Sequence, residues 1–207
     1  MESQKKNPKS KEKDLLEFVK RRGLVRVKDV IDAGYYSQTL RRLHQKELLI
    51  RVSRGLYSHP DMIPGEHQSL VEVAKRVPRA IVCLLTALRY HNIGTQNPKD
   101  VWIALPPNLR KPKMQYPPTR VVRFSGDALT EGVEHHMLRG VEVKIYNPAK
   151  TVADCFKHRK KIGLDVAMEA LKDVIQRRKC TVDDIWYYAK IDRVTKVIEP
   201  YMTAMLA

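Results

Sequence analysis

The sequence predicts an α+β protein in two parts: a small helical domain that ends in a β-hairpin, and a larger α+β domain with a small, mostly antiparallel sheet and a helical C-terminus. The length of 207 residues favours two domains of ordinary size. Short β-branched runs lie between amphipathic helical patterns, as in α+β folds. The segment HPDMIPGE (59–66) separates two differently patterned regions and contains two Pro and one Gly. We therefore expect a basic flexible tail at 1–13, a first domain at 14–58, a linker at 59–66 and a second domain at 67–207.

The first domain begins with two predicted helices. Leu15, Phe18 and Val19 recur at helical spacing behind Ser10, and Gly23 ends the pattern. Val27, Val30 and Ile31 share one face of a second, shorter helix, and Gly34 follows where a left-handed C-terminal residue is needed.

A third helix and a hairpin complete this domain. Ser37 is the expected N-cap, Leu40 and Leu43 face inward, and the opposite face carries Gln38, Arg41, Arg42 and Gln45. The run LLIRVSRGLYS alternates apolar and polar residues around a tight turn at Ser53-Arg54-Gly55, which predicts a β-hairpin. This order of elements is that of a winged helix-turn-helix.

The charge of the chain points to a polyanionic partner. Lys and Arg number 39 against 23 Asp and Glu, a formal charge of +16, and residues 1–58 carry +8 of it (15 basic, 7 acidic). Arg and Gln can each make paired hydrogen bonds to base edges in the major groove of DNA. The base-contact candidates are Gln38, Thr39, Arg41, Arg42 and Gln45. The candidates for contacts with the DNA backbone, or from the wing, are Ser37, Lys46, Arg51, Ser53 and Arg54.

Two other interpretations of the first domain stay open. The polar residues of the third helix also fit an ordinary solvated face, and a winged helix can serve as a protein-interaction adaptor. The tail lysines fit either phosphate contacts or a solvated tail: they are Lys5, Lys6, Lys9, Lys11 and Lys13.

The second domain contains helices around a set of strands. Helices are predicted over 67–77 and 80–90, and β-rich runs follow at VWIAL (101–105) and RVVRF (120–124). HHML and VEVKIY are predicted to form a hairpin around Arg139-Gly140. Asn147 caps a helix with Pro148 at its first position, and further helices are predicted over 164–178, from Thr181 onward, and over about 193–205.

No catalytic residues, metal ligands or cofactor are expected in this chain. Glu142 and Lys144, with Asp127 and Asp100 upstream, form the skeleton of a metal-dependent nuclease site, and a winged-helix-targeted nuclease is the alternative from another functional class. The same alternation is typical of any half-exposed strand. His135 and His136 are adjacent on a predicted strand and therefore point to opposite faces.

The second domain also carries scattered basic residues. They form either a second surface that binds a polyanion, or favourable interactions with the negative C-terminal ends of helix dipoles. These residues are Arg110, Lys111, Lys113, Lys157, Arg159, Lys160, Lys161, Arg177, Arg178 and Lys179.

The location expected from the sequence is the cytoplasm. The longest apolar run, Ile81 to Leu85, is far shorter than the ~20 residues that span a bilayer. The N-terminus lacks the hydrophobic stretch of a secretory signal, and the widely spaced Cys83, Cys155 and Cys180 fit free thiols in a reducing compartment.

A succession of sequence strings resembles a known family. TLRRLHQKELLIRVSRGLY is followed by CLLTALRYHNI, VWIALPPNLRKP, RVVRFSG and YNPAKTVADCFKHRKKIGLDVAMEAL. Their order and spacing resemble the AbiEi family of antitoxins and transcriptional regulators, from about residue 10 onward. Asn92 departs from the residue that relatives usually carry there.

The resemblance implies an N-terminal winged helix-turn-helix that represses its own operon, in a bacterial type IV toxin-antitoxin system of the abortive-infection kind. It further implies a C-terminal domain that opposes a nucleotidyltransferase-like toxin without a stable complex. The expected DNA partner is a double-stranded operator with an inverted repeat. The protein would be a monomer or weak dimer that places two copies on DNA, with no membrane partner.

Overall fold

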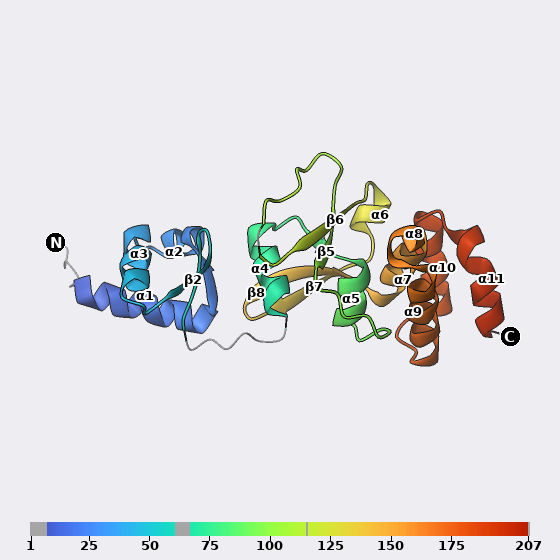
Figure 1. The fold of residues 1–207 in the computed structure, drawn as a ribbon, viewed down its shortest axis with the longest axis horizontal. Coiled ribbons are helices and arrows are strands. Elements are labelled where there is room, and N and C mark those ends of the chain that lie inside the picture. Colours follow the sequence, from blue (N-terminus) through green and yellow to red (C-terminus); the bar gives the residue numbers. More distant parts are fainter. Residues whose placement is uncertain (1–7, 61–66, 115, 207) are drawn as a thin grey trace, which may run out of the picture. The chain divides into compact units, whose positions relative to one another are not determined.

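A computed structural model describes residues 8–60, 67–114 and 116–206 (Figure 1). The chain divides into two compact units. The first spans Met1–Lys75 with Leu138–Val141, and the second spans Arg76–Met137 with Glu142–Ala207. The expected linker at 59–66 falls inside the first unit, and its residues 61–66 lie outside the described part of the chain. No helix among the described residues is long and apolar enough to cross a membrane.

The first unit combines helices with a three-stranded antiparallel sheet in the order β1-β3-β2. Its elements are α1 (Pro8–Arg22), β1 (Leu24–Arg26), α2 (Val27–Asp32), α3 (Ser37–Gln45), β2 (Ile50–Ser53), β3 (Leu56–Ser58) and α4 (Gln68–Arg76). One apolar core joins α1, β1, α2, α3 and β3, with Leu15 and Val19 of α1 packed near Leu40 and Leu43 of α3. A second, smaller cluster packs Val71 of α4 with Leu24 and Leu56. The helix order and the hairpin agree with the sequence expectation.

Two local features of this unit correct that expectation. The segment 8–13 is helical, because α1 begins at Pro8, so it is not part of a flexible tail; residues 1–7 lie outside the described residues. Leu24–Arg26 forms a strand that was not anticipated. A strand of three residues leaves almost no periodic signal in the sequence, and pairing with β3 creates it.

Helix α4 belongs to the first unit through polar contacts with α2 and β1. The ammonium of Lys75 forms an ion pair with Asp29 at 2.9 Å and also donates to the carbonyl of Leu24. The guanidinium of Arg26 donates to the carbonyl of Ala74 at 3.4 Å. This compact unit therefore extends beyond residue 58.

The second unit surrounds a five-stranded sheet with helices. Its further elements are β4 (Ile81–Val82), α5 (Leu84–Tyr90), β5 (Val101–Leu105), β6 (Thr119–Arg123), α6 (Asp127–Thr130), β7 (Val133–Leu138), β8 (Val141–Tyr146), α7 (Pro148–Lys157), α8 (Arg159–Ile162), α9 (Leu164–Gln176), α10 (Val182–Ile191) and α11 (Thr195–Leu206). The largest core cluster joins the sheet to α5, α7, α9, α10 and α11, and includes Trp102, Tyr146, Phe156 and Leu171.

The larger sheet is mixed, which corrects the expected mostly antiparallel sheet. Its order is β6-β5-β4-β8-β7; β4 pairs antiparallel with β5, whereas β5–β6 and β4–β8 are parallel pairs. Parallel pairing needs a connection of about a dozen residues or more. The Pro-rich segment 106–118 supplies it between β5 and β6.

The expected helix over 80–90 splits into a strand and a shorter helix. Ile81 and Val82 form β4, and Cys83 is extended (φ −142°) as the N-cap of α5. The two β-branched residues lie in the middle of the sheet, between β5 and β8. Sheet pairing therefore overrides the helical pattern that continues after them.

Candidate nucleic-acid interface

Helix α3 presents the polar face that its sequence predicts. Leu40 and Leu43 are buried in the core of the first unit, and Thr39 is half-buried. Four long side chains of this helix are exposed: Gln38, Arg41, Arg42 and Gln45. The helix therefore turns hydrogen-bonding groups toward solvent while apolar contacts hold its backbone.

Ser37 is not the N-cap of α3. The N-cap is Tyr36, in an extended conformation (φ −89°, ψ 134°) and without a side-chain capping bond, and Ser37 is the first helical residue. The turn after Gly34 (φ +82°) brings the chain into the helix one residue earlier than a serine cap would. The Ser37 side chain lines the groove beside the helix instead.

A groove of about 450 Å³ lies between α3 and the β2–β3 hairpin. From α3, Arg41, His44 and Gln45 line it, and Arg51 and Arg54 line it from the hairpin. Gly55 (φ +77°) makes the tight turn that follows Arg54, a conformation that favours glycine. The structure thus brings together residues from two elements that the sequence could only propose separately.

The groove is electropositive, and no carboxylate lines it. Among the described residues, no ion pair or hydrogen bond engages the side chains of Arg41 or Arg54. Guanidinium groups in this state keep all their donors for an external acceptor. The arrangement can bind a phosphodiester backbone and reach base edges at the same time.

His44 was not among the candidates, yet it lines the groove. Its Nδ1 lies 3.0 Å from the carbonyl oxygen of Leu49, and its ring meets Tyr57 edge-on with 6.0 Å between centroids. These two contacts fix the imidazole between Arg41 and the hairpin. The sequence signal for its place in the groove was its position three residues after Arg41, which puts both side chains on the same side of α3.

Not every candidate lies in the groove. Gln38, Thr39 and Arg42 are on α3 outside its lining, and Lys46 forms a 2.6 Å ion pair with Glu12 of α1. Ser53 pairs with Leu56 in the hairpin register, and its side chain is not described. Lys46 therefore ties α3 to α1 rather than pointing into the groove.

The basic residues of the second unit do not form one patch. Lys111 and Lys161 meet in a hollow of about 380 Å³, together with Arg120, which was not among the candidates. Four others have internal partners: Lys157 with Asp192, Arg159 with the Phe156 carbonyl, Arg177 with Asp173, and Lys179 with the His91 carbonyl. The remaining candidates are exposed: Arg110, Lys113, Lys160 and Arg178.

The residues of the alternative nuclease skeleton are dispersed. The Glu142 carboxylate lies 3.0 Å from Nδ1 of His135, and Asp100 forms an ion pair with Arg120 at 2.6 Å. Within the described ranges, no group of three or more His, Cys, Asp or Glu side chains could hold a metal ion. This geometry does not favour the nuclease interpretation.

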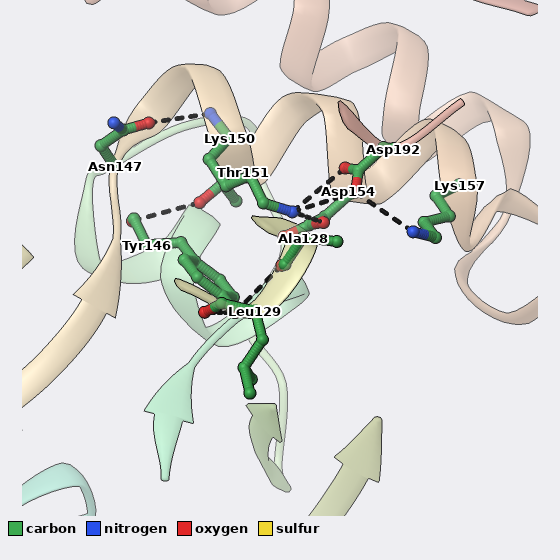
Figure 2. Close-up of polar contacts among 9 residues, drawn as sticks. All are labelled: Ala128, Leu129, Tyr146, Asn147, Lys150, Thr151, Asp154, Lys157 and Asp192. Atoms are coloured by element: carbon green, nitrogen blue, oxygen red, sulfur yellow. Dashed lines mark hydrogen bonds and ion pairs between the residues drawn. The ribbon is translucent and has the colours of Figure 1, made fainter. Parts of the chain in front are cut away.

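The second unit contains a buried charge cluster that sequence reasoning missed (Figure 2). Lys150 is fully buried, and its ammonium contacts Asp154 and both carboxylate oxygens of Asp192, at 3.1 and 3.2 Å. Lys157 reaches Asp192 from the half-buried end of α7, at 3.2 Å. The signal was present in PAKTVADCF, where Lys150 and Asp154 are four residues apart in an otherwise apolar helix.

Aromatic rings enclose this ammonium. Nζ of Lys150 lies 4.8 Å from the ring centre of Phe124 and 5.0 Å from that of Tyr146. Burial alone would lower the pKa of Lys150, but the carboxylates of Asp154 and Asp192 outweigh it and raise the pKa above its ordinary value. Lys150 therefore stays charged in the core, where it links α7 to the end of α10.

Comparisons with known proteins agree with the fold and with the N-terminal resemblance. Residues 13–58 match the family model described as transcriptional regulator, AbiEi antitoxin, which confirms the resemblance over that segment. The chain is similar to the crystal structure of the RV2827C protein from Mycobacterium tuberculosis, with 15% identity and a TM-score of 0.61. That match covers 87% of this chain and 71% of the other, and at this identity it shows the fold alone. No curated protein matches the chain.

Proposed function

We propose that this protein is a DNA-binding transcriptional regulator and antitoxin of the AbiEi type, with residues 14–58 acting as a winged helix-turn-helix. The observation that carries the proposal is the groove in which α3 and the hairpin turn Arg41, Gln45, Arg51 and Arg54 toward one electropositive surface. The matched family segment, 13–58, spans that groove completely.

The two sides of the groove have different tasks in this proposal. Helix α3 enters the major groove, where Arg41 reads guanine and Gln38 or Gln45 reads adenine. Arg54, at the tip of the hairpin, lies along the phosphate backbone and contributes affinity without reading sequence. The half-buried Thr39 and the exposed Arg42 lie beside this path.

The operator is expected to contain an inverted repeat. A single helix of this size contacts only a few base pairs, so two copies on two half-sites are needed for useful specificity. We propose that the free protein is a monomer or weak dimer and that DNA brings the two copies together.

The antitoxin half of the proposal rests on the family description. The second unit would oppose a nucleotidyltransferase-like toxin in the cytoplasm without forming a stable complex. Coexpression of the two proteins is expected to restore growth that the toxin alone arrests. Growth arrest that persists despite soluble, DNA-binding antitoxin would contradict this half and leave the regulator half intact.

The test of the regulator half measures the Kd for two duplexes of equal length, one taken from upstream of the gene for this protein and one of random sequence. Arg41→Ala and Gln38→Ala are expected to weaken binding to the upstream duplex by about tenfold or more, because a bidentate base contact contributes roughly 1–3 kcal/mol. Their effect on the random duplex should be small. Lys190→Ala, an exposed lysine on α10, is the matched control.

Equal losses on both duplexes would remove the assignment of α3 as the recognition helix. The absence of salt-dependent binding to either duplex would contradict DNA binding altogether, because phosphate contacts release counterions.

A further inference from the structure

The second unit contains a hollow of about 510 Å³ that none of the functions above uses. Its polar lining comes from five separate places in the chain: Arg79 before β4, Asn108 after β5, Thr130 at the end of α6, His135 on β7 and Lys144 on β8. The volume is within the roughly 300–1,000 Å³ typical of small-molecule sites.

The apolar part of this hollow belongs to the core side of the sheet. Ile81 is 7% exposed, and Lys144 is its register partner across β4 and β8. Ala104, opposite Ile81 on β5, belongs to the same core cluster. Leu129 and Val133, both half-buried against that cluster, add two further apolar surfaces.

The part of the lining that α6 contributes is held in place by internal hydrogen bonds. The buried hydroxyl of Tyr146 donates to the carbonyl of Leu129 at 2.8 Å, as Figure 2 shows. The backbone N–H of Asn147 donates to the carbonyl of Gly132 at 2.8 Å, which fixes the segment between α6 and β7. Internal hydrogen bonds therefore order the backbone of this part of the lining, so a ligand does not have to order it on binding.

The charge of the lining selects the ligand. Arg79 and Lys144 are both cationic, and no carboxylate lines the hollow. Within the described residues, neither side chain takes part in an ion pair or hydrogen bond. Glu142 contacts the ring of His135 at 3.0 Å, is not part of the lining, and forms no ion pair with Arg79 or Lys144. Lys144 is half-buried, has no counterion and lies beside apolar side chains of the lining. This combination favours a ligand that has both an anionic group and an apolar part.

We propose that this hollow binds a small organic anion, with a phosphate or carboxylate head between Arg79 and Lys144 and an apolar ring or chain on Ile81, Leu129 and Val133. Asn108 and the Thr130 hydroxyl supply neutral hydrogen bonds at the rim. The site lies within the second unit and is separate from the groove of α3. It does not depend on the proposed DNA-binding function.

The experiment titrates the full chain, isotopically labelled, with phenyl phosphate and follows backbone amide shifts by NMR. Inorganic phosphate represents the head alone, and benzyl alcohol represents the neutral ring. Saturable shifts are expected around residues 79–81, 129–135 and 144, with each of the two partial probes binding about tenfold more weakly or worse. Phosphate that binds as tightly as phenyl phosphate would overturn the proposal, as would shifts centred on residues 37–57.

Variants identify the cations that hold the head. Lys144→Gln and Arg79→Gln are each expected to weaken phenyl phosphate binding by about tenfold, since each removes a charge-assisted contact. Lys190→Gln should leave the affinity unchanged. Arg79 is exposed, so its variant keeps the test valid if Lys144→Gln does not fold. Wild-type affinity in a folded Arg79→Gln or Lys144→Gln would overturn the proposal.

Discussion

The groove of the first unit and the cluster around Lys150 in the second unit both contain cationic side chains, but those of the groove are exposed and Lys150 is buried. Arg41 and Arg54 are exposed and have no internal partner among the described residues. Lys150 is fully buried and contacts two carboxylates and two aromatic rings. Cations left open to solvent are available for a partner molecule, whereas a cation enclosed in a core has its charge matched by the protein itself.

This difference separates binding from stability. Removing an exposed guanidinium leaves no buried group without a partner, so the free energy of unfolding should hardly change. Removing Lys150 leaves carboxylates in a core that cannot solvate them. The net charge of +16 therefore does not identify the functional residues, because burial decides what each charge does.

The largest expected effect is at the buried cluster. Lys150→Met should lower the free energy of unfolding by about 3–5 kcal/mol, because it leaves Asp154 without its partner and Asp192 with Lys157 alone. Urea denaturation measures the change. Lys160→Met, an exposed lysine on α8, is the control and should change stability by no more than about 0.5 kcal/mol.

A second variant keeps this prediction testable if Lys150→Met does not fold. Adding Asp154→Leu to it removes the carboxylate that has lost its partner, so part of the lost stability should return. A loss below about 1 kcal/mol in Lys150→Met would mean that the cluster is hydrated, and the contrast between the two regions would then disappear.

An intermediate effect is expected at His158 when the pH is lowered. Burial, with help from Lys161 and Lys157, lowers the pKa of His158 from 6.5 to about 4. The folded state therefore holds this ring neutral where the unfolded chain protonates it. Its contribution to stability is complete above pH 6.5 and is lost as the pH falls through the interval down to about 4.

The measurement is the urea midpoint at pH 7 and at pH 4.5, in wild type and in His158→Gln. The variant should lose less stability between these pH values than wild type, by about 1 kcal/mol, since the ring is still partly open to water. His135→Gln, at a mostly exposed ring, is the control. Parallel pH curves for wild type and His158→Gln would contradict the prediction.

The smallest expected effect is at the tip of the hairpin. Arg54→Ala should weaken binding to every DNA sequence alike and reduce the slope of log K against log salt by about one, the contribution of one phosphate contact. Its stability should match wild type. A loss of preference between the upstream and random duplexes would move Arg54 from the backbone to the bases.

Much of the first unit was predictable from its sequence, because its signals are local. The spacing of Leu40 and Leu43 fixed the inner face of α3, and Gly34 and Gly55 marked turns that need a positive φ. What could not be predicted were features made by partners distant in the chain. Strand β1 exists through its pairing with β3, and Lys46 is held by Glu12 of α1.

The second unit shows the same limit more strongly. The start of α10 at Thr181 was predictable, because Thr181 and Asp184 lie three residues apart and form a capping box, a local signal. The parallel pairs β5–β6 and β4–β8 were not, because the sequence pattern of a strand does not record the direction of its neighbour. The place of Asp192 beside Lys150, 42 residues away, was equally hidden.

The sequence by itself determined which side chains can carry function: the excess of basic residues, the polar face of α3 and the arginines of the hairpin. Only the tertiary structure decided which of them do so together. It placed Arg41 and Arg54 on one groove, buried Lys150, and left Arg79 and Lys144 facing a common hollow. The physical reason is that hydrogen-bonding capacity belongs to a residue, whereas desolvation and proximity belong to the packed chain.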